Sequence, residues 1–326
     1  MLNQEAIIWD AHTCVPLLQQ SKLEKLLIRH HKAGFHFASI NIGMDMIPSK
    51  QTLELLNIFR AEIASSQFLR QAHSISDIVQ AKKNRQLAVA FDIEGASLFL
   101  ESSDMVERLH RLGVKQALLA YNRNNRLAGG CFDSEMSLTA KGKDIISAMS
   151  GCGMIIDCAH MGYRSSMDVM EYADSPVIFS HANVSKIWQS ERNLRDEQIK
   201  ACAQTGGVVC VSGLSWLLGL DHPKVECLVQ HIDYIASLVG IDHVGIGLDY
   251  VYDDHVDDLP EEVNMQYWWP NAKFTHRQFS CSFLPPEEMI NIKKLLYHRY
   301  SRENAQKILG ENMLKLATTI WKTQLT

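Results

Sequence analysis

Two short apolar runs, MIIDCAH (154–160) and PVIFSHA (176–182), decide the fold that this sequence predicts. Each run has the length of a single strand, is nearly continuous in apolarity and has a histidine at or next to its end. Such runs are typical of parallel strands whose two faces are both covered by helices. Parallel neighbours need crossover connections, so we expect helices between the strands.

The same pattern recurs along the whole chain. Between the runs lie longer segments with helical spacing, such as 227–240, where apolar side chains return at steps of three and four. The candidate strands are residues 6–12, 36–43, 87–95, 116–122, 154–160, 176–182, 206–213 and 243–250. Eight βα units predict an α/β fold, either a closed (β/α)8 barrel or an open doubly wound sheet.

Two observations favour the barrel. No Gly-rich phosphate turn follows the first strand, as a dinucleotide-binding sheet would need. Metal-competent residues also stand at the carboxyl ends of five strands, namely His12, Glu94, His160, His181 and Asp249. In a barrel all of these converge on one face, where active sites of this fold lie. We therefore predict a single (β/α)8 TIM barrel over residues 1–326.

Two segments depart from the βα rhythm. Residues 251–285 are acidic, then aromatic, and without clear periodicity. We interpret them as a long loop after strand eight that covers part of the active-site mouth, with an exposed connection as the alternative. The C-terminal residues predict two further helices, the second beginning near Ser301.

Composition excludes several classes of function. A net charge of −5 gives no electrostatic footprint for nucleic acid. No run of about 18 apolar residues predicts a membrane span, and the N-terminus lacks the pattern of a signal peptide. The eight cysteines are scattered singly, which indicates a reduced, cytoplasmic protein. The expected partner is a small-molecule or dipeptide substrate.

The strand-end histidines point to metal chemistry. A lone histidine there is usually a satisfied core residue, but His12, His160 and His181 come from three strands of one barrel and join Glu94. Imidazole and carboxylate ligands suit zinc and related divalent ions. Glu94 has two oxygens, so it is able to bridge two metals about 3.5–4 Å apart.

A family resemblance extends over nearly the whole chain. The stretches that carry it are DIEG (92–95), NRNNRLAGG (122–130), IIDCAH (155–160), PVIFSHA (176–182), ERNLRDEQIKACAQTGGVV (191–209) and HIDYIASLVGIDHVGIGLDY (231–250). In this order and spacing they resemble the membrane dipeptidase family, peptidase family M19 of the metal-dependent hydrolase superfamily. The resemblance implies a barrel that hydrolyses dipeptides at a binuclear zinc site, and a homodimer.

The resemblance also assigns roles to individual residues. His12 matches a ligand of the first metal, Glu94 the bridge, and His160 and His181 the ligands of the second metal. Arg192, eleven residues after His181, matches the residue that binds the substrate carboxylate. The alternative for Arg192 is a surface salt bridge.

Asp249 completes the set implied by the resemblance. It matches the carboxylate that holds the substrate's amino group and handles a proton, which makes Asp249 and Glu94 the expected catalytic residues. The alternative for Asp249 is a helix cap or a loop-ordering role.

Two positions depart from the family pattern. Cys14 stands where the family has a ligand Asp, and Tyr121 where it has a His that polarises the scissile carbonyl. A thiolate is a good zinc ligand at about 2.3 Å, and a phenol can donate to an oxyanion. Three outcomes stay open: a Cys-ligated binuclear site, one metal at Glu94, His160 and His181, or binding without turnover. Cys14 is otherwise a buried, unliganded thiol.

These observations predict a metal-dependent hydrolase that cleaves dipeptides or dipeptide-like amides through a metal-activated water. Zn²⁺ is the expected ion, one or two per chain, with Mn²⁺ or Fe²⁺ as alternatives. The competing hypotheses are an amidohydrolase for a non-peptide amide or N-substituted amino acid, and a non-catalytic metabolite-binding barrel. A phosphotriesterase-like enzyme is disfavoured because His12-x-Cys14 does not supply that class's His-x-His pair.

Overall fold

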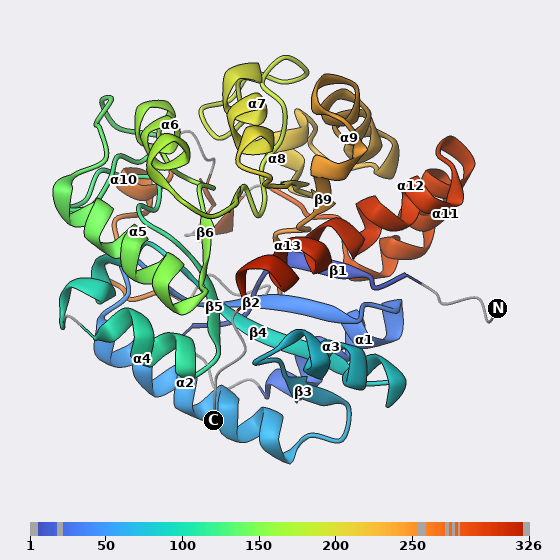
Figure 1. Cartoon of the computed structure of the whole chain (residues 1–326), viewed down its shortest axis with the longest axis horizontal. Coiled ribbons are helices and arrows are strands. Elements are labelled where there is room, and N and C mark those ends of the chain that lie inside the picture. Colours follow the sequence, from blue (N-terminus) through green and yellow to red (C-terminus); the bar gives the residue numbers. More distant parts are fainter. Residues whose placement is uncertain are drawn as a thin grey trace.

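The computed structural model describes residues 6–17, 22–102, 104–252, 259–270, 274–275, 278–279 and 281–321. Within these ranges a curled parallel sheet is surrounded by helices (Figure 1). Its strands are β1 (Trp9–Cys14), β2 (Phe37–Met44), β3 (Leu69–Gln71), β4 (Leu87–Glu94), β5 (Val114–Leu118), β6 (Ile155–Asp157), β7 (Val177–Ile178), β8 (Val209–Val211), β9 (Val244–Ile246) and β10 (Tyr250–Val251).

The strands close into a ring. Neighbours follow the order β10-β1-β2-β4-β5-β6-β7, and each pair is parallel. A parallel bridge from Phe179 to Val209 continues the ring from β7 to β8, which pairs with β9. β10 follows β9 in the chain and pairs with β1 through Thr13 and Tyr250. This closure confirms the predicted barrel.

β3 is the strand that the sequence prediction missed. It pairs only with β4, outside the ring, and its three residues are too few to show a period. Several predicted strands are also too long, because residues 119–122 and 158–160 leave the ladder and turn into the mouth of the barrel. These strands therefore end where the chain turns toward the mouth of the barrel, and not where the apolar runs end.

The helices pack one apolar face against the sheet. In α9 the predicted stripe is fully buried at Leu228, Ile232 and Ile235. The α-helices are α1 (Leu23–Ala33), α2 (Ser49–Ser65), α3 (Ile75–Lys83), α4 (Met105–Arg111), α5 (Ala140–Cys152), α6 (Tyr163–Tyr172), α7 (Asp196–Gln204), α8 (Ser215–Leu218), α9 (Val225–Val239), α10 (Met265–Trp268), α11 (Met289–Arg299), α12 (Arg302–Gln306) and α13 (Asn312–Ile320). Short 3₁₀ segments cover Ala96–Leu100, Ile241–His243 and Pro286–Glu288, and a π segment covers Lys307–Glu311.

The C-terminal helices have a definite place in the barrel. α12 begins after Ser301, whose side chain accepts from the Asn304 N–H, as the sequence predicts. α13 lies across the amino-terminal end of the strands (Figure 1), where Trp321 and Ile320 pack with Trp9 and Phe37. Because apolar side chains plug this end, function is confined to the opposite, carboxyl end.

The predicted loop after strand eight covers part of the cavity at that end. Leu259, Trp269 and the segment from Cys281 to Pro285 line the cavity, which confirms the interpretation for the described part of the loop. The loop also contains α10 and a small hairpin of β11 (Phe274–Thr275) and β12 (Gln278–Phe279), which the sequence did not predict. Residues 253–258, 271–273, 276–277 and 280 lie outside the described residues.

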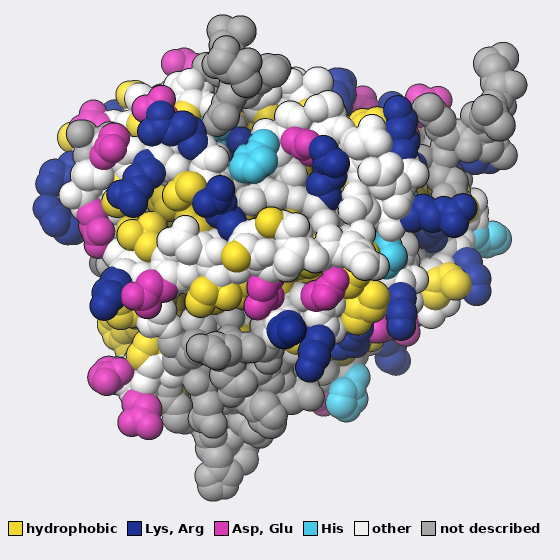
Figure 2. All heavy atoms as spheres, turned by 90° about the horizontal axis from the view of Figure 1, so that it is seen from below, with side chains coloured by type: hydrophobic (Ala, Val, Ile, Leu, Met, Phe, Trp, Pro, Cys, Tyr) yellow, Lys and Arg dark blue, Asp and Glu magenta, His cyan; other side chains and the backbone are white. Residues whose placement is uncertain are grey.

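Two further observations concern the surface. No helix in the described part of the chain combines the length and apolarity needed to cross a bilayer. On the face drawn in Figure 2, basic and acidic side chains are interspersed rather than gathered by sign.

Candidate metal and substrate site

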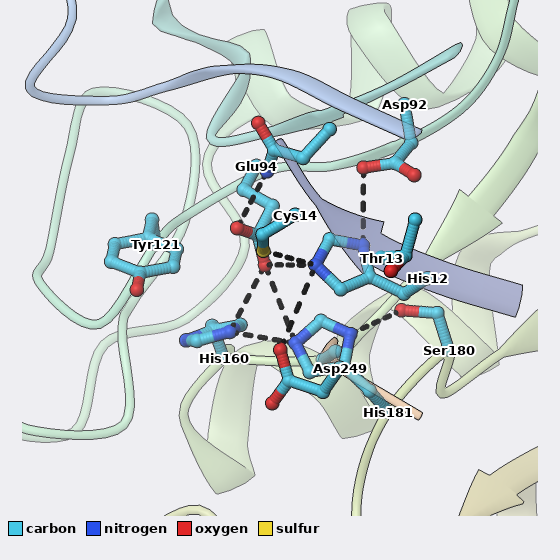
Figure 3. Close-up of polar contacts among 12 residues, drawn as sticks. His12, Thr13, Cys14, Asp92, Glu94, Tyr121, His160, Ser180, His181 and Asp249 are labelled. Carbon is cyan, nitrogen blue, oxygen red and sulfur yellow. Dashed lines mark hydrogen bonds and ion pairs between the residues drawn. The ribbon is translucent and has the colours of Figure 1, made fainter. Parts of the chain in front are cut away.

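Five strands deliver the predicted site residues to one point (Figure 3). His12 lies on β1 and Glu94 at the end of β4, while His160, His181 and Asp249 follow β6, β7 and β9. All five are enclosed at the carboxyl end of the barrel, and none of the three histidines is more than 8% exposed. Separate strands thus converge as the barrel requires.

Glu94 stands at the centre of this cluster. Its Oε1 lies 3.6 Å from His12 Nε2, 3.1 Å from His160 Nε2 and 3.3 Å from His181 Nε2. That oxygen is buried and accepts no hydrogen bond, whereas Oε2 accepts from Asn41 Nδ2 at 2.6 Å. One carboxylate oxygen is therefore held in place and the other faces three ring nitrogens.

Two of the rings are held through their Nδ1 atoms by acceptors. His12 Nδ1 lies 3.2 Å from Asp92 Oδ1, and His160 Nδ1 lies 2.7 Å from Asn122 Oδ1. The Asn122 oxygen accepts from His160, so the proton of that ring belongs on Nδ1 and its Nε2 carries a lone pair. His12 differs: burial alone would lower its pKa, but the Asp92 and Glu94 carboxylates raise that pKa well above its usual value.

His181 follows the same rule. Its Nδ1 lies 2.8 Å from the Ser180 hydroxyl, which itself donates to Asp157. Ser180 therefore accepts from Nδ1–H, and Nε2 of His181 is left without a proton. Its distance to His160 Nε2 is 2.8 Å, so two bare lone pairs face each other.

The arrangement fits a divalent cation. Three imidazole Nε2 atoms and an orphaned buried carboxylate oxygen form a donor set typical of zinc and related ions. The lone pairs of His160 and His181 repel one another until a cation draws them together, and the groups behind each ring are those that orient metal ligands. Glu94, His160 and His181 form one such group and His12, Cys14 and Glu94 another. The residues present fit the metal that the family implies.

Burial dominates the electrostatics of this cluster. It raises the pKa of Glu94 to about 8, with the neighbouring Asp249 and Asp92 acting in the same direction. It lowers the pKa of His160 well below its usual value, and Arg192 adds to that effect. Without a cation these shifts favour the neutral forms of Glu94 and His160, because a charge on either side chain lacks solvent.

The pKa of Asp249 is raised less than that of Glu94. Burial raises its pKa to about 6, partly opposed by His12 and Arg192. Its Oδ1 lies 3.9 Å from His12 Nε2, and Oδ2 accepts from the Ser212 hydroxyl at 3.4 Å. A carboxyl group with a pKa near neutrality is able both to accept and to return a proton.

Backbone strain is concentrated at the same place. Asn122, His160 and Asp249 adopt left-handed φ angles of 59°, 62° and 58°, which side-chain-bearing residues rarely do. Each is a residue where the chain leaves a strand and turns into the mouth. Strain of this kind persists where the surrounding structure holds it, and it clusters at functional sites.

Cys14 lies beside His12 at the end of β1. Its Sγ is 3.4 Å from His12 Nε2, and burial raises the pKa of the thiol to about 12. The thiol therefore keeps its proton as long as no cation is present. A cation bound there would favour the thiolate instead, because a coordinating thiol is deprotonated.

Arg192 and Tyr121 flank His160 on two sides. Arg192 is only 7% exposed, and its Nη2 lies 2.9 Å from His160 Nε2, so it is not in a surface salt bridge. The Tyr121 ring stacks on His160 with 4.1 Å between centroids. The structure thus brings every predicted site residue to one cluster.

The α10 segment is attached to the same cluster. Trp269 Nε1 donates to the Tyr121 hydroxyl at 3.0 Å, and Asn122 Nδ2 donates to the Trp268 carbonyl at 2.9 Å. Asn122 also accepts from His160, so it links the loop to a candidate ligand. The loop after strand eight thereby helps to set the ring of His160 and the hydroxyl of Tyr121.

Sequence reasoning missed the residues behind the ligands. Asn41, Asp92, Asn122 and Ser180 hold the carboxylate and the imidazoles. Each is a polar residue inside or just after an apolar strand, and that exception to the pattern is the signal that could have found them. Trp269 left no such signal, because aromatics in a loop are common.

The site opens into a cavity of about 520 Å³, within the range of small-molecule sites. Glu94, His160, Arg192 and Asp249 lie at its inner end, and the remaining wall is largely apolar. The mouth therefore admits a compact molecule with a polar reactive end.

The barrel, the cavity and the candidate ligand cluster together give this protein the architecture of a metal-dependent hydrolase. The chain belongs to the membrane dipeptidase family, peptidase family M19, whose family model matches residues 5–268.

Individual relatives agree with this assignment. The dipeptidase tcpJ of Claviceps purpurea is 27% identical over 254 residues, and the match covers 76% of this chain and 54% of that protein. The chain thus spans about half the length of that relative. An uncharacterised protein encoded in the pqqA 5′ region of Klebsiella pneumoniae is 31% identical over 266 residues, which cover 78% of this chain and 90% of that protein.

Solved structures share the fold. An amidohydrolase from Pseudomonas aeruginosa superposes with a TM-score of 0.84 at 22% identity, covering 97% of both chains. A metallopeptidase from Rhodobacter sphaeroides, bound to a phosphinate mimic of the dipeptide L-Ala-D-Ala, has a TM-score of 0.78 at 17% identity. That match covers 98% of this chain and 100% of the other.

Proposed function

We propose that this protein is a metal-dependent hydrolase that cleaves the amide bond of dipeptides or closely related small amides. The observation that carries the proposal is the orphaned Glu94 oxygen, which faces the Nε2 atoms of three histidines. Family membership adds support, because the relatives include proteins named as dipeptidases.

Glu94 would bridge two ions, with His160 and His181 on one side and His12 and Cys14 on the other. Bound there, a divalent ion polarises a carbonyl and lowers the pKa of water toward 7, which supplies a nucleophile at neutral pH. Zn²⁺ is the ion we propose from this donor set, with Mn²⁺ and Fe²⁺ as alternatives.

The other side chains would orient the substrate and move the proton. Arg192 pairs with the free carboxylate, for which its planar guanidinium is suited. Asp249 takes a proton from the attacking water and returns it to the leaving amine as the C–N bond breaks. With a pKa near 6 it is largely ionised, and so ready to accept, at neutral pH.

Tyr121 would stabilise the developing oxyanion. Its oxygen already accepts from Trp269 Nε1, so its own O–H is available to donate toward the carbonyl oxygen. This donation would replace the role that a histidine has in the family. The proposal also includes a cytoplasmic location, supported by eight cysteines that are all free thiols, and a homodimer.

The test is an assay of a dipeptide panel with purified, metal-loaded protein, alongside the His160→Ala variant. Hydrolysis by the wild type and its loss in the variant support the proposal. Absence of turnover on every dipeptide contradicts it, and turnover that survives loss of His160 contradicts the metal's role. N-acyl amino acids in the same panel test the second candidate, an amidohydrolase for N-substituted amino acids, which the changes at Cys14 and Tyr121 favour.

A further inference from the structure

The cavity wall is unevenly divided between polar and apolar groups. Its charged residues lie at the ligand end, and the larger part of the wall is aliphatic or aromatic. The apolar part includes Leu17, Met44, Phe132, Trp216, Leu259 and Phe283. An apolar wall of this extent favours an apolar group, because burying such a group removes both surfaces from water.

Two of these aromatic residues lie near Arg192. The Phe132 and Trp216 rings are nearly parallel, with an interplanar angle of 18° and centroids 6.4 Å apart. Cys131, just before Phe132, donates its N–H to the carbonyl of His160, the residue that Arg192 contacts. The chain around Phe132 is thereby fixed beside the ligand cluster.

Trp216 is connected to the other side of Arg192. Asn193, which follows Arg192, donates through Nδ2 to the carbonyl of Leu217 at 2.9 Å. Leu217 is the residue after Trp216, and all three residues Arg192, Trp216 and Leu217 line the cavity. Phe132, Trp216 and Arg192 therefore line the same cavity, and hydrogen bonds join the segments that carry them.

Both rings are carried by backbone that is already fixed. The Phe132 N–H donates to the Asn122 carbonyl at 2.9 Å, and the Phe132 carbonyl accepts from Arg123 Nη1 at 2.8 Å. Ser215, next to Trp216, exchanges two hydrogen bonds with Ser282, of 2.8 and 3.0 Å. Preorganised apolar walls bind more tightly because little ordering is needed on binding.

A glycine makes the Phe132 turn feasible. A Cβ on Gly130 would lie 2.2 Å from the backbone of Asn122 and Arg123, so the two loops cross as closely as a glycine allows. The crossing places Phe132 against the cavity rather than outside it.

We propose that the carboxylate-bearing residue of the preferred ligand carries a large apolar side chain, which packs against Phe132 and Trp216. The inference rests on the proposed function, since it takes Arg192 as the carboxylate anchor. A carboxylate held by Arg192 leaves the side chain of the same residue within reach of both rings. The ligand class is thus a dipeptide-like amide with an aromatic or branched C-terminal residue.

The expected preference is substantial. Full burial of a large apolar side chain corresponds to a factor of about ten to a hundred in binding or in kcat/KM. We expect Ala-Phe to exceed Ala-Ala by that factor, with either stereochemistry tested at the second residue.

The variants are Trp216→Ala and Phe132→Ala, and the matched control is Tyr297→Ala, an exposed aromatic on α11 outside the cavity. Either cavity variant is expected to reduce the ratio of Ala-Phe to Ala-Ala turnover by about tenfold. The control is expected to keep the wild-type ratio. Because the readout is a ratio of two substrates, a variant that merely folds less well lowers both rates and leaves the ratio intact.

Calorimetry with hydrolysis-resistant phosphinate mimics of the same two dipeptides separates this inference from the proposed function. Tighter binding of the Phe mimic, lost in Trp216→Ala, supports the inference even if the wild type cleaves no dipeptide, an outcome that overturns only the dipeptidase proposal. Cleavage of both dipeptides at equal kcat/KM, with equal affinity for both mimics, overturns the inference and leaves the proposed function standing.

Discussion

The two halves of the candidate metal centre differ in how completely their ligands are in place. Around Glu94, His160 and His181 the donor atoms are buried and lie close to one another. In the other half, the Asp92 and Glu94 carboxylates raise the pKa of His12 against the effect of burial, and Cys14 keeps its thiol proton. The barrel fixes the place of a ligand, whereas the side chain at that place fixes its chemistry.

Glu94 belongs to both halves of the centre, so we expect the largest effect from Glu94→Gln. An amide cannot supply the negative charge that both ions need, so turnover is expected to fall about a thousandfold or more. Elemental analysis is expected to show loss of metal from both halves. Retention of one tightly bound ion per chain would show that the halves are independent.

In the metal-free protein, Glu94→Gln is expected to stabilise the fold, although it is also expected to abolish metal binding and most turnover. Burial raises the folded-state pKa of Glu94 to about 8, whereas an unfolded glutamate has a pKa near 4.5. At pH 7 folding therefore takes up a proton, and wild-type stability falls as the pH rises between these two values. Glu94→Gln is expected to raise the free energy of unfolding by roughly 3 kcal/mol at pH 7, with the gain vanishing toward pH 4.5. Urea titrations of chelator-treated protein at both pH values measure the difference.

His181→Ala removes a ligand from only one half of the centre, the half formed by Glu94, His160 and His181. We expect the metal content to drop by one ion per chain and kcat to fall about a hundredfold, because one of three ligands is lost while Glu94 and His12 stay. Elemental analysis and steady-state kinetics measure both effects. His231→Ala provides the control, since its buried imidazole accepts from the Val184 N–H and belongs to none of the candidate ligand groups in the described part of the chain. Equal metal loss in the two variants would contradict the assignment.

Cys14 decides the character of the other half. In cobalt-substituted protein we expect a thiolate-to-metal charge-transfer band in the near ultraviolet, absent from Cys14→Ser. Activity is expected to fall about tenfold in Cys14→Ser and to be largely kept in Cys14→Asp, which offers an ionised oxygen ligand. A wild-type spectrum without the band would identify Cys14 as an unliganded thiol.

Trp269→Phe is expected to have the smallest effect. It removes one hydrogen bond to Tyr121 and keeps the aromatic packing, so kcat is expected to fall about three- to tenfold with little change in KM. In a Tyr121→Phe background, Trp269→Phe is expected to change kcat very little, because the hydroxyl that Trp269 orients is absent. Additive effects in the double variant would show that Trp269 acts only through packing.

Much of the fold was readable in the sequence. Two local patterns carried this information: the apolar runs that contain His160 and His181, and the spacing of Leu228, Ile232 and Ile235. Such patterns survive folding because they reflect which face of a segment is buried. β3 and α10 were not readable, since both are held by contacts with distant segments rather than by a period of their own.

The candidate site was readable only in part. Five ligand candidates stand at strand ends, so the barrel alone implies that they meet. Asn41 and Asn122 gained their roles from partners on other strands, at separations of 53 and 38 residues, and Ser180 is held by Asp157 of β6, 23 residues away. Pairings of that kind depend on register and on loop geometry, which no single segment encodes.

The sequence by itself determined the barrel, the family and the identities of the ligand candidates, including the change to Cys14. Only the tertiary structure decided that Glu94 keeps an unpaired oxygen, that three imidazoles face it, and that Phe132 and Trp216 line the same cavity as Arg192. The physical reason is that identity and burial are properties of segments. Protonation, orientation and cavity shape arise from groups that come together only when the ring of strands closes.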